Sequence, residues 1–497
     1  MTNTRPHATF FGAFALMMVF ANACYSDDAL SRIDQFGGPA AQVNSRGIAM
    51  DSEKNIITVW SLAGTADFNP RNGTALRASD NGQVVVSKID KAGKLKWAVQ
   101  LGTPQFQTGS VTPYAMSTDA SDNIFIVGQF SGTADFDPGA NANLLTNTGD
   151  SSGGFIVKLN SAGQFVWAGH FASTSDAAIT GITTGFDDKI VVCGRYYDSM
   201  DFNPTAALTT TLTSAGSGDA FVIQLLTDGN LGFSANIRDD ASETCEGVVQ
   251  DAQGNIYYTG TFTGFSQTGN VDFDPSGGSF VMGGTGFSSV YIVKVTKDRG
   301  FLWAKQFNSN GNSLGNPRIA VDKNGDVFVS GTFYETCDFD PGAGVFNLAP
   351  TSNSAAYLVK LSMAGEFIWV KAVSGNDLIP ASLTTDKKGA VYLSCLFVAL
   401  AKTGPATAFA DSSKIPSYYQ VYFEKRKPNG KRVWSGTIGD DRSITLSDGL
   451  VVDRKLKLYS AASFNKTIDI EPGESEVNRT AEGGRDGLLL KFNLPKD

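Results

Sequence analysis

Short apolar runs recur along the chain at a spacing of roughly 66 residues. Each run has eight residues, is rich in β-branched and aromatic side chains, and ends in a large apolar residue. The seven runs are residues 55–62, 123–130, 189–196, 255–262, 326–333, 390–397 and 457–464. Runs of this length and composition, bounded by turn residues, predict buried β-strands, because helices need longer periodic segments. The chain is therefore predicted to contain seven copies of one β-rich repeat.

Turn-forming residues punctuate the copies at matching places. An aspartate stands four residues before every run except the third, where Gly185 replaces it. Because such an aspartate accepts a hydrogen bond from the backbone two residues on, we interpret Asp-x-x-x-Asn as a hairpin turn and not as a metal loop. The six aspartates are Asp51, Asp119, Asp251, Asp322, Asp386 and Asp453. A short apolar strand precedes each turn.

Two further strands follow each run. The third strand ends in a lysine at Lys88, Lys158, Lys294, Lys360, Lys425 and Lys491, with Gln224 as the exception. The fourth contains a tryptophan at Trp97, Trp167, Trp303, Trp369 and Trp434, with Phe233 in the third copy. Because these residues recur at one place in the repeat, we interpret them as packing residues and not as a ligand site.

Four antiparallel strands per copy describe one blade of a β-propeller. An isolated blade exposes two edges and buries little apolar surface, so we expect the blades to close into a ring. The seventh copy ends near Lys491 before any fourth strand, and residues 34–37 resemble the fourth-strand sequence at 99–102. The sequence therefore predicts an all-β, seven-bladed β-propeller of four-stranded antiparallel blades, with the last blade closed by the N-terminal strand.

The predicted propeller is one domain over residues 24–497, preceded by a signal peptide at 1–23. The blades are expected near residues 47–102, 112–172, 179–237, 245–307, 317–373, 381–438 and 448–494, with the closing strand at 29–38. Arg5 precedes an apolar stretch over residues 8–20, and Ala21 and Ala23 suit a small-x-small cleavage site. The sequence therefore predicts export, either by secretion or to the outer surface of a bacterium.

Cleavage after Ala23 would leave Cys24 at the N-terminus, where a bacterial lipoprotein carries lipid. Plain secretion is the alternative, because Ala21 stands where a lipobox prefers leucine. The other cysteines are Cys193, Cys245, Cys337 and Cys395. They can pair in an oxidising compartment, or they can be small buried apolar residues, and the sequence leaves the pairing open.

The chain has 40 lysines and arginines against 49 aspartates and glutamates, and it has no long basic run. A formal charge of −9 excludes a typical nucleic-acid-binding surface, because such surfaces are positively charged. We expect a monomer with an extracellular protein or glycan as its partner. Membrane contact is expected only through a lipid on Cys24.

The repeat resembles that of a known family. Residues 132–139 (Gly-Thr-Ala-Asp-Phe-Asp-Pro-Gly), 155–159 (Phe-Ile-Val-Lys-Leu) and 165–167 (Phe-Val-Trp) are similar to the bacterial seven-bladed β-propeller (SBBP) repeat. The resemblance extends over residues 29–494. It implies an exported propeller, and the family offers no catalytic residues to carry over.

An acidic signature follows the second strand in six copies: an acid, an aromatic residue or isoleucine, a second acid or amide, and proline. Alternate residues of an extended chain point to opposite sides, so both polar residues face away from the middle one. Because Ca²⁺ prefers carboxylate and carbonyl oxygens, the signature is a candidate calcium site. The candidate ligands are Asp67, Asp135, Asp137, Asp201, Asp272, Asp274, Asp338, Asp340, Asp469 and Glu471.

The alternative for this signature is that the acid caps its loop by accepting backbone N–H groups. The sixth copy separates the two interpretations, because Lys402 and Gly404 replace the acids there. A calcium site is expected to be empty in that blade, and the copies with Asn69 and Asn203 are expected to bind calcium more weakly.

Two main functions stay open, and a purely architectural role in the cell envelope is a third. The first is a non-enzymatic scaffold that binds a protein or glycan through the loops after the signatures, with Phe280, Phe287, Tyr418 and Tyr419 as candidate aromatic contacts. The second is an extracellular hydrolase or lyase that uses carboxylates, with or without calcium. A histidine-based triad would rest on His170, and no isolated acid stands out in an innermost strand. No catalytic or cofactor-binding residue is assigned.

Overall fold

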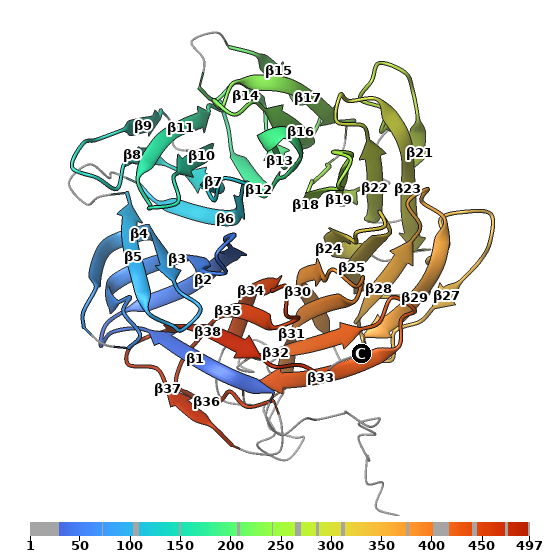
Figure 1. The fold of residues 1–497 in the computed structure, drawn as a ribbon. Helices are drawn as coiled ribbons and strands as arrows, with labels where there is room; N and C mark the ends of the chain where they lie inside the picture. The colour runs from blue at the N-terminus through green and yellow to red at the C-terminus, as the bar shows by residue number, and fades with distance from the viewer. Residues whose placement is uncertain are drawn as a thin grey trace, which may run out of the picture.

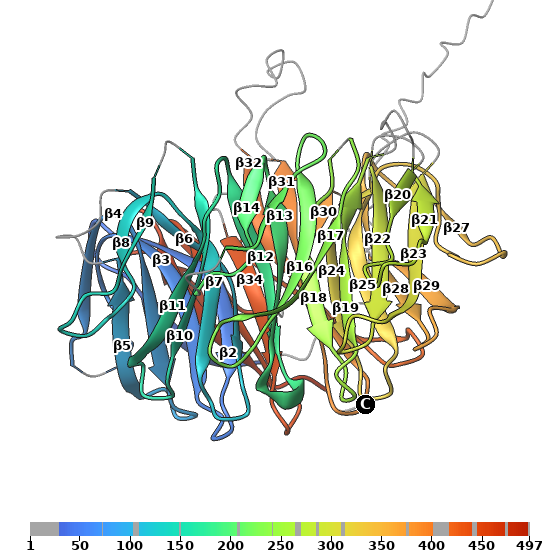
Figure 2. The same cartoon turned by 90° about the horizontal axis from the view of Figure 1, so that it is seen from above.

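Seven antiparallel blades of four strands each stand in chain order around a central axis, and the sheet of the fourth blade continues into two further short strands (Figure 1). The computed structural model describes residues 29–495 except 72, 103–108, 149–150, 206–208, 241, 264–269, 285–287, 310–313, 374–376, 401–416, 440–444 and 473–475. In the view turned by 90°, the ring is a thick disc with loops on both faces (Figure 2). The prediction of an all-β, seven-bladed propeller is confirmed.

Blades 1 to 3 place their first strand nearest the axis and their fourth strand at the rim (Figure 1). Blade 1 contains β2 (Gln42–Met50), β3 (Ile56–Asp67), β4 (Leu76–Ile89) and β5 (Leu95–Leu101). Blade 2 contains β6 (Val111–Thr118), β7 (Ile124–Phe130), β10 (Gly153–Leu159) and β11 (Phe165–Phe171). Blade 3 contains β12 (Ala177–Thr184), β13 (Ile190–Tyr196), β16 (Asp219–Leu225) and β17 (Leu231–Ile237).

Blades 4 to 7 repeat this order. Blade 4 contains β18 (Gly247–Gln250), β19 (Ile256–Phe262), β22 (Ser289–Val295) and β23 (Phe301–Ser309). Blade 5 contains β24 (Leu314–Val321), β25 (Val327–Phe333), β28 (Ala355–Leu361) and β29 (Phe367–Val373). Blade 6 contains β30 (Leu378–Thr385), β31 (Val391–Leu400), β32 (Ser417–Arg426) and β33 (Arg432–Ile438). Blade 7 contains β34 (Thr445–Val452), β35 (Leu458–Phe464) and β38 (Asp486–Phe492), and its fourth strand is β1 (Leu30–Phe36).

The N-terminal strand β1 closes the ring, as predicted. It pairs antiparallel with β38, so that Phe36 lies opposite Gly487. The Phe36 side chain is fully buried, with its ring centroid 5.1 Å from that of Trp60 and 6.0 Å from that of Phe68. Because Trp60 and Phe68 belong to blade 1, one strand both completes the last blade and holds it against the first.

Short hairpins extend the loops between second and third strands in five of the blades, within the described residues. They are β8 (Gly132–Asp135) with β9 (Leu144–Asn147), β14 (Ser199–Asp201) with β15 (Thr211–Thr213), β20 (Asn270–Asp272) with β21 (Val281–Gly283), β26 (Cys337–Asp338) with β27 (Asn347–Leu348), and β36 (Thr467–Asp469) with β37 (Asn478–Thr480). In blade 1, the extended ends of β3 and β4 pair in the same place. The acidic signatures begin at the ends of these extensions.

The predicted aspartate turns connect first and second strands. Asp119 Oδ1 accepts hydrogen bonds from the backbone N–H of Ser121 (3.0 Å) and Asn123 (2.8 Å). In the third copy, which lacks the aspartate, a short 3₁₀ turn η1 (Phe186–Asp188) replaces this arrangement. The turn interpretation of Asp-x-x-x-Asn therefore agrees with the hydrogen bonds of the structure.

The repeated tryptophans and lysines join each blade to the next. Trp303 Nε1 and Lys294 Nζ of blade 4 both donate to the Met363 carbonyl in a turn of blade 5, at 3.2 and 3.1 Å. Gly365 in the same turn has φ of +78°, and a Cβ there would lie 3.1 Å from the Trp303 ring. A glycine is required because the turn must both adopt a left-handed conformation and lie flat on the indole. The interpretation of these residues as packing residues is thus supported.

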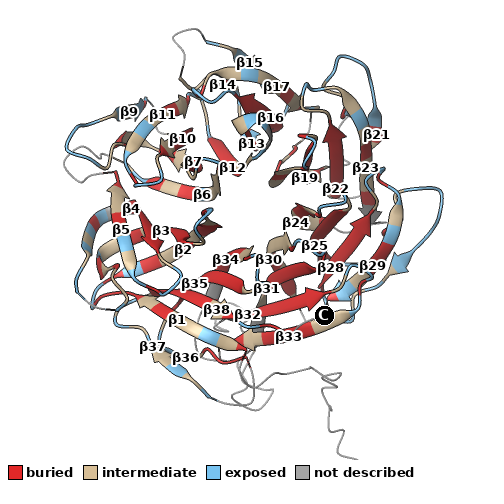
Figure 3. Ribbon diagram, viewed as in Figure 1, coloured by how far each residue is buried: buried red, intermediate tan, exposed pale blue. Residues whose placement is uncertain are grey.

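Apolar cores lie between neighbouring blades, where buried residues fill the second and third strands while the rim strands stay partly exposed (Figure 3). One core combines Val191 and Val222 of blade 3 with Tyr258 and Val293 of blade 4. Each blade therefore depends on its neighbours for burial, which explains why the ring has to close.

Candidate ligand site in the central channel

The acidic signatures cap their loops. Asp135 Oδ1 accepts hydrogen bonds from the backbone N–H of Asp137 (3.0 Å) and Asn143 (2.8 Å). Phe136 between the two acids is fully buried and packs edge-on against Phe130, with ring centroids 5.5 Å apart. The first acid makes the same pair of backbone contacts in the five other signatures, at Asp67, Asp201, Asp272, Asp338 and Asp469.

The second acid of the signature has a local role too. Asp137, Asp274 and Asp340 each accept a backbone N–H from the residue two positions on, at 2.7 to 2.9 Å. Each signature lies in the loop of its own blade. Among the described residues, no group of three or more histidines, cysteines, aspartates or glutamates is placed to hold a metal ion. Calcium binding at these loops stays a prediction.

The other candidate residues lie away from the axis or beyond the described chain. His170 in β11 has Nε2 3.1 Å from Asn147 Oδ1, and burial lowers its pKa to about 4. Phe280 packs on Phe301 at the rim, with ring centroids 5.1 Å apart. Tyr419 belongs to strand β32. Cys24, Phe287, Lys402 and Gly404 lie outside the described residues, and so does the predicted signal peptide.

The innermost strands contain a feature that the repeat pattern does not reveal. In β2, β6, β12, β30 and β34 the pairing register skips one residue. A β-bulge of this kind leaves the extra residue outside the hydrogen-bond ladder and redirects its side chain. The skipped residues are Arg46, Tyr114, Thr180, Ala381 and Asp448, and all five line one cavity on the axis.

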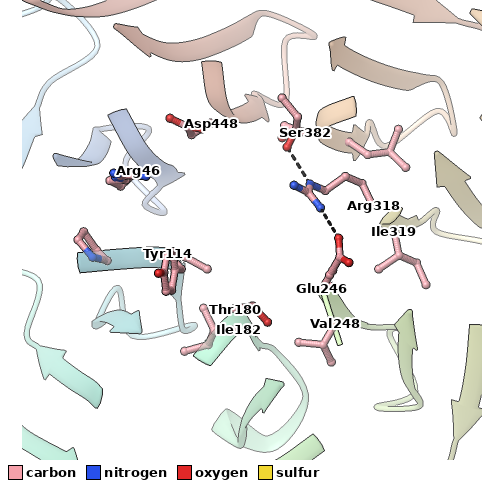
Figure 4. Close-up of a pocket in the computed structure, with 16 residues that line it drawn as sticks. Arg46, Tyr114, Thr180, Ile182, Glu246, Val248, Arg318, Ile319, Ser382 and Asp448 are labelled. Atoms are coloured by element: carbon pink, nitrogen blue, oxygen red, sulfur yellow. Dashed lines mark hydrogen bonds and ion pairs between the residues drawn. The ribbon is translucent and has the colours of Figure 1, made fainter. Parts of the chain in front are cut away.

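The cavity has a volume of about 440 Å³ and is formed by the first strands of all seven blades. Glu246 and Arg318 extend the ring of inward residues through blades 4 and 5 (Figure 4). The hydroxyls of Thr180 and Ser382 and the ring of Tyr114, which is 36% exposed, complete the polar part of the wall. Its volume and its few convergent polar groups are typical of a small-ligand site.

Arg318 is held in place by three partners, one of which is the neighbouring Pro317 carbonyl at 3.0 Å from Nη1. Its Nη1 lies 3.4 Å from Glu246 Oε2, and its Nε donates to the Ala381 carbonyl at 3.0 Å. Glu246 also accepts a hydrogen bond from Thr244 Oγ1 at 3.2 Å. This network crosses from blade 4 to blade 6 and leaves the guanidinium at the cavity wall (Figure 4). An arginine fixed in this way is suited to bind an oxyanion without a large loss of side-chain entropy.

Arg46 occupies another part of the same wall, near Asp448 (Figure 4). Its Nε is buried and has no hydrogen-bond partner within the described part of the chain. A buried donor of this kind is costly unless water or a ligand satisfies it. Arg46 as a whole is only half-buried and lines the cavity, so the accessible part of its side chain is where an acceptor oxygen in the channel could bind.

The surroundings raise the pKa of both carboxyl groups that line the cavity. Burial raises the pKa of Glu246, against the attraction of Arg318 and Arg195. Asp448 is exposed to the channel, but the surrounding blades displace bulk water and raise its pKa to about 6, against the attraction of Arg46, Arg318 and Arg485. Four arginines thus act on two acids, and the cavity wall itself carries two arginines and two carboxyl groups.

The sequence analysis missed Glu246 and Asp448. It found no isolated acid in an innermost strand, whereas Asp448 is the skipped residue of β34 and Glu246 directly precedes β18. The sequence did contain one signal, because the residue type at these positions differs from copy to copy while the framework residues recur. Copies aligned on their first strands carry Arg, Tyr, Thr, Glu, Pro, Ala and Asp there, and not one recurring residue.

No helix in the described residues is long and apolar enough to cross a membrane. No protein-family model matches the chain, so the resemblance to the SBBP repeat is not confirmed. A curated relative, the uncharacterized WD repeat-containing protein L264 of Acanthamoeba polyphaga mimivirus, is 21% identical over 457 residues. The match covers 77% of this chain and 32% of that protein, so this chain spans about a third of the relative's length.

Solved structures with similar folds have low sequence identity to this chain. A protein of unknown function from Dyadobacter fermentans has a TM-score of 0.40 and 13% identity, covering 80% of this chain and 99% of that one. A putative gluconolactonase has a TM-score of 0.31 and 9% identity, covering 95% and 97%. A glucose dehydrogenase has a TM-score of 0.33 and 9% identity, covering 73% and 96%. These likenesses assign no activity to this chain.

Proposed function

We propose that this chain is an exported, non-enzymatic propeller that binds an acidic glycan, with a carboxylate or sulfate group seated in the central channel. The observation that carries the proposal is the pair Arg46 and Arg318, which face the cavity from opposite sides of the channel (Figure 4). Tyr114 offers an exposed ring face, and Thr180 and Ser382 offer hydroxyls, as a sugar requires. A cavity of about 440 Å³ has room for a small saccharide unit.

The proposal includes the predictions made from the sequence about the setting of the protein. The chain belongs to the SBBP repeat proteins, is exported, is either secreted or anchored by a lipid on Cys24, and acts as a monomer. The resemblance of residues 132–139 to that repeat and the leader-like residues 1–23 support these parts.

Calorimetric titration with galacturonate oligosaccharides and with neutral galactose oligosaccharides tests the proposal. We expect binding of the acidic series alone. Arg46→Gln should weaken it by about 10- to 150-fold, because a hydrogen bond to a charged group contributes roughly 1.5–3 kcal/mol. Arg479→Gln on the outer hairpin β37 is the matched control and should bind as the wild type does. Equal binding of both sugar series, or no effect of Arg46→Gln, would refute an anion site in the channel.

The carboxyl groups of Glu246 and Asp448 favour a second candidate, a hydrolase or lyase acting on the same acidic glycan. Both groups line the cavity that would hold the sugar. Mass spectrometry of the oligosaccharides after long incubation separates the two functions. Unchanged chain lengths agree with the binding protein, while shortened products that disappear in Asp448→Asn would indicate an enzyme.

Calcium binding at the signature loops is a separate part of the proposal. After chelation, calcium should raise the melting temperature if Asp137, Asp274 and Asp340 supply ligands. The triple variant with asparagine at these positions is the control. Absence of both heat and a melting shift in the wild type would end the calcium hypothesis.

A further inference from the structure

Two of the four cysteines in the described residues lie at one boundary between blades. Cys193 is in β13, the second strand of blade 3, and Cys245 lies two residues before β18, the first strand of blade 4. Both side chains are at most 1% exposed. They belong to one apolar core that joins blades 3 and 4, together with residues such as Val248 and Tyr291. The ring closure therefore brings together two thiols that are far apart in the chain.

The two cysteines lie close together across the blade boundary. Thr180 in β12 contacts both backbones, since its hydroxyl donates to the Cys245 carbonyl and lies 3.4 Å from the Cys193 carbonyl. Both side chains are also buried in the same core between the blades. A disulfide needs two cysteines whose side chains can approach without backbone movement, and this shared position at the boundary is where such a bond would form.

The remaining cysteines are placed differently. Cys337 lies in the core between blades 4 and 5, where its thiol donates to the Asp338 carbonyl at 3.6 Å. Cys395 lies in the core between blades 5 and 6. Because the two belong to separate cores, they are not arranged to pair with each other or with the first pair.

We infer that Cys193 and Cys245 form a disulfide that joins blades 3 and 4 when the chain folds in an oxidising compartment. The two S–H bonds break and one S–S bond forms. The two protons and two electrons pass to a disulfide oxidant, which is reduced to two thiols. The proposed export supplies such a compartment, but the inference about the pair itself is tested in vitro and does not depend on glycan binding.

Because the pair is buried, the disulfide has to form before blades 3 and 4 pack against each other. A folded, reduced protein keeps both thiols away from solvent, and burial raises the pKa of the Cys193 thiol, so that little reactive thiolate exists. The bond is therefore made while the boundary between blades 3 and 4 is still open. The disulfide would also restrain the channel wall, because Cys245 immediately precedes Glu246 and Thr180 itself lines the cavity.

Refolding under two redox conditions tests the inference. The denatured full chain carrying Cys24→Ser is refolded with a mixture of oxidised and reduced glutathione, or with dithiothreitol. It is then alkylated with iodoacetamide in denaturant and mapped by mass spectrometry. We expect two alkylated cysteines after oxidative refolding, Cys337 and Cys395, with Cys193 and Cys245 in one linked peptide pair. Refolding in reductant should give four alkylated cysteines.

Variants separate this pair from any other. Cys193→Ser should leave Cys245 alkylated after oxidative refolding, whereas Cys395→Ser should retain the link. Folded reduced protein exposed to the same glutathione mixture should oxidise far more slowly than the refolding chain. Four alkylated cysteines after oxidative refolding, a different linked pair, or glutathione attached to Cys193 or Cys245 would overturn the inference.

Discussion

Replacing Phe36 by alanine tests how the ring is closed. The Phe36 side chain is fully buried, and its ring packs on Trp60 and Phe68 of blade 1 while its backbone pairs with Gly487 of blade 7. Truncation of a buried phenylalanine costs about 3–5 kcal/mol of stability through lost burial and the cavity left behind. The folded-to-unfolded ratio should therefore fall by about three orders of magnitude.

The matched control is Ser31→Ala on the same strand. The Ser31 side chain is exposed and its hydroxyl donates only to the Lys491 carbonyl, so its removal should cost at most about 0.5 kcal/mol. Urea unfolding followed by tryptophan fluorescence gives the free energy of unfolding of both variants. Hydrogen exchange then locates the effect, which should appear first in β1 and β38. Equal stability of the two variants, or unprotected β1 amides in the wild type, would refute closure by the N-terminal strand.

Three further outcomes are expected. A sulfated monosaccharide, whose charge is constant between pH 5 and 8, should bind at least about fivefold more tightly below the Asp448 pKa of about 6 than at pH 7.5. The reason is that the ionised carboxylate repels the sulfate, and two unit charges near 4 Å interact by about 1 kcal/mol even in water. Asp448→Asn should abolish this pH dependence in calorimetric titrations. Burial and the neighbouring Asp239 raise the pKa of Glu243 from 4.5 to about 9, so this group's stabilising contribution is complete below pH 4.5 and is lost as the pH rises toward 9. In the wild type, the free energy of unfolding in urea should therefore fall by up to about 1.4 kcal/mol per pH unit across that range. Glu243→Gln should remove this pH dependence. Oxidatively refolded protein should be more stable than Cys193→Ser by about 4 kcal/mol, since the Cys193–Cys245 bond would close a loop of about fifty residues, and equal urea midpoints would argue against the bond.

The frame of the propeller was predictable because it is built from repeated local rules. The aspartate turns, the lysine that ends each third strand and the tryptophan of each fourth strand recur at fixed offsets, and each has one contact to make. Even the missing fourth strand of the last copy was informative, since an open blade would leave apolar surface and a strand edge exposed. The structure places β1 in that gap.

The channel was not predictable for a physical reason. In five of the seven innermost strands, the side chain that points to the axis depends on a one-residue bulge, and a shift of one residue moves every side chain to the opposite face of a strand. The strands that hold Arg46 and Asp448 also contain other polar residues, such as Asn44 and Ser447, so their pattern does not reveal the bulge. The proximity of Cys193 and Cys245 was hidden similarly, because it depends on how two blades face each other.

The contrast between repeated and unrepeated positions carries the functional argument further. A residue that builds the ring must recur, because every blade makes the same contacts with the next. A residue that binds a single ligand on the axis has no reason to recur, since the ligand is not sevenfold symmetric. The inward positions hold Arg46, Tyr114, Thr180, Glu246 and Asp448 in place of one shared side chain, so the cavity wall differs in charge and chemistry from blade to blade. A purely architectural ring has no need for such an asymmetric axis, whereas a ring that orients one anionic ligand does.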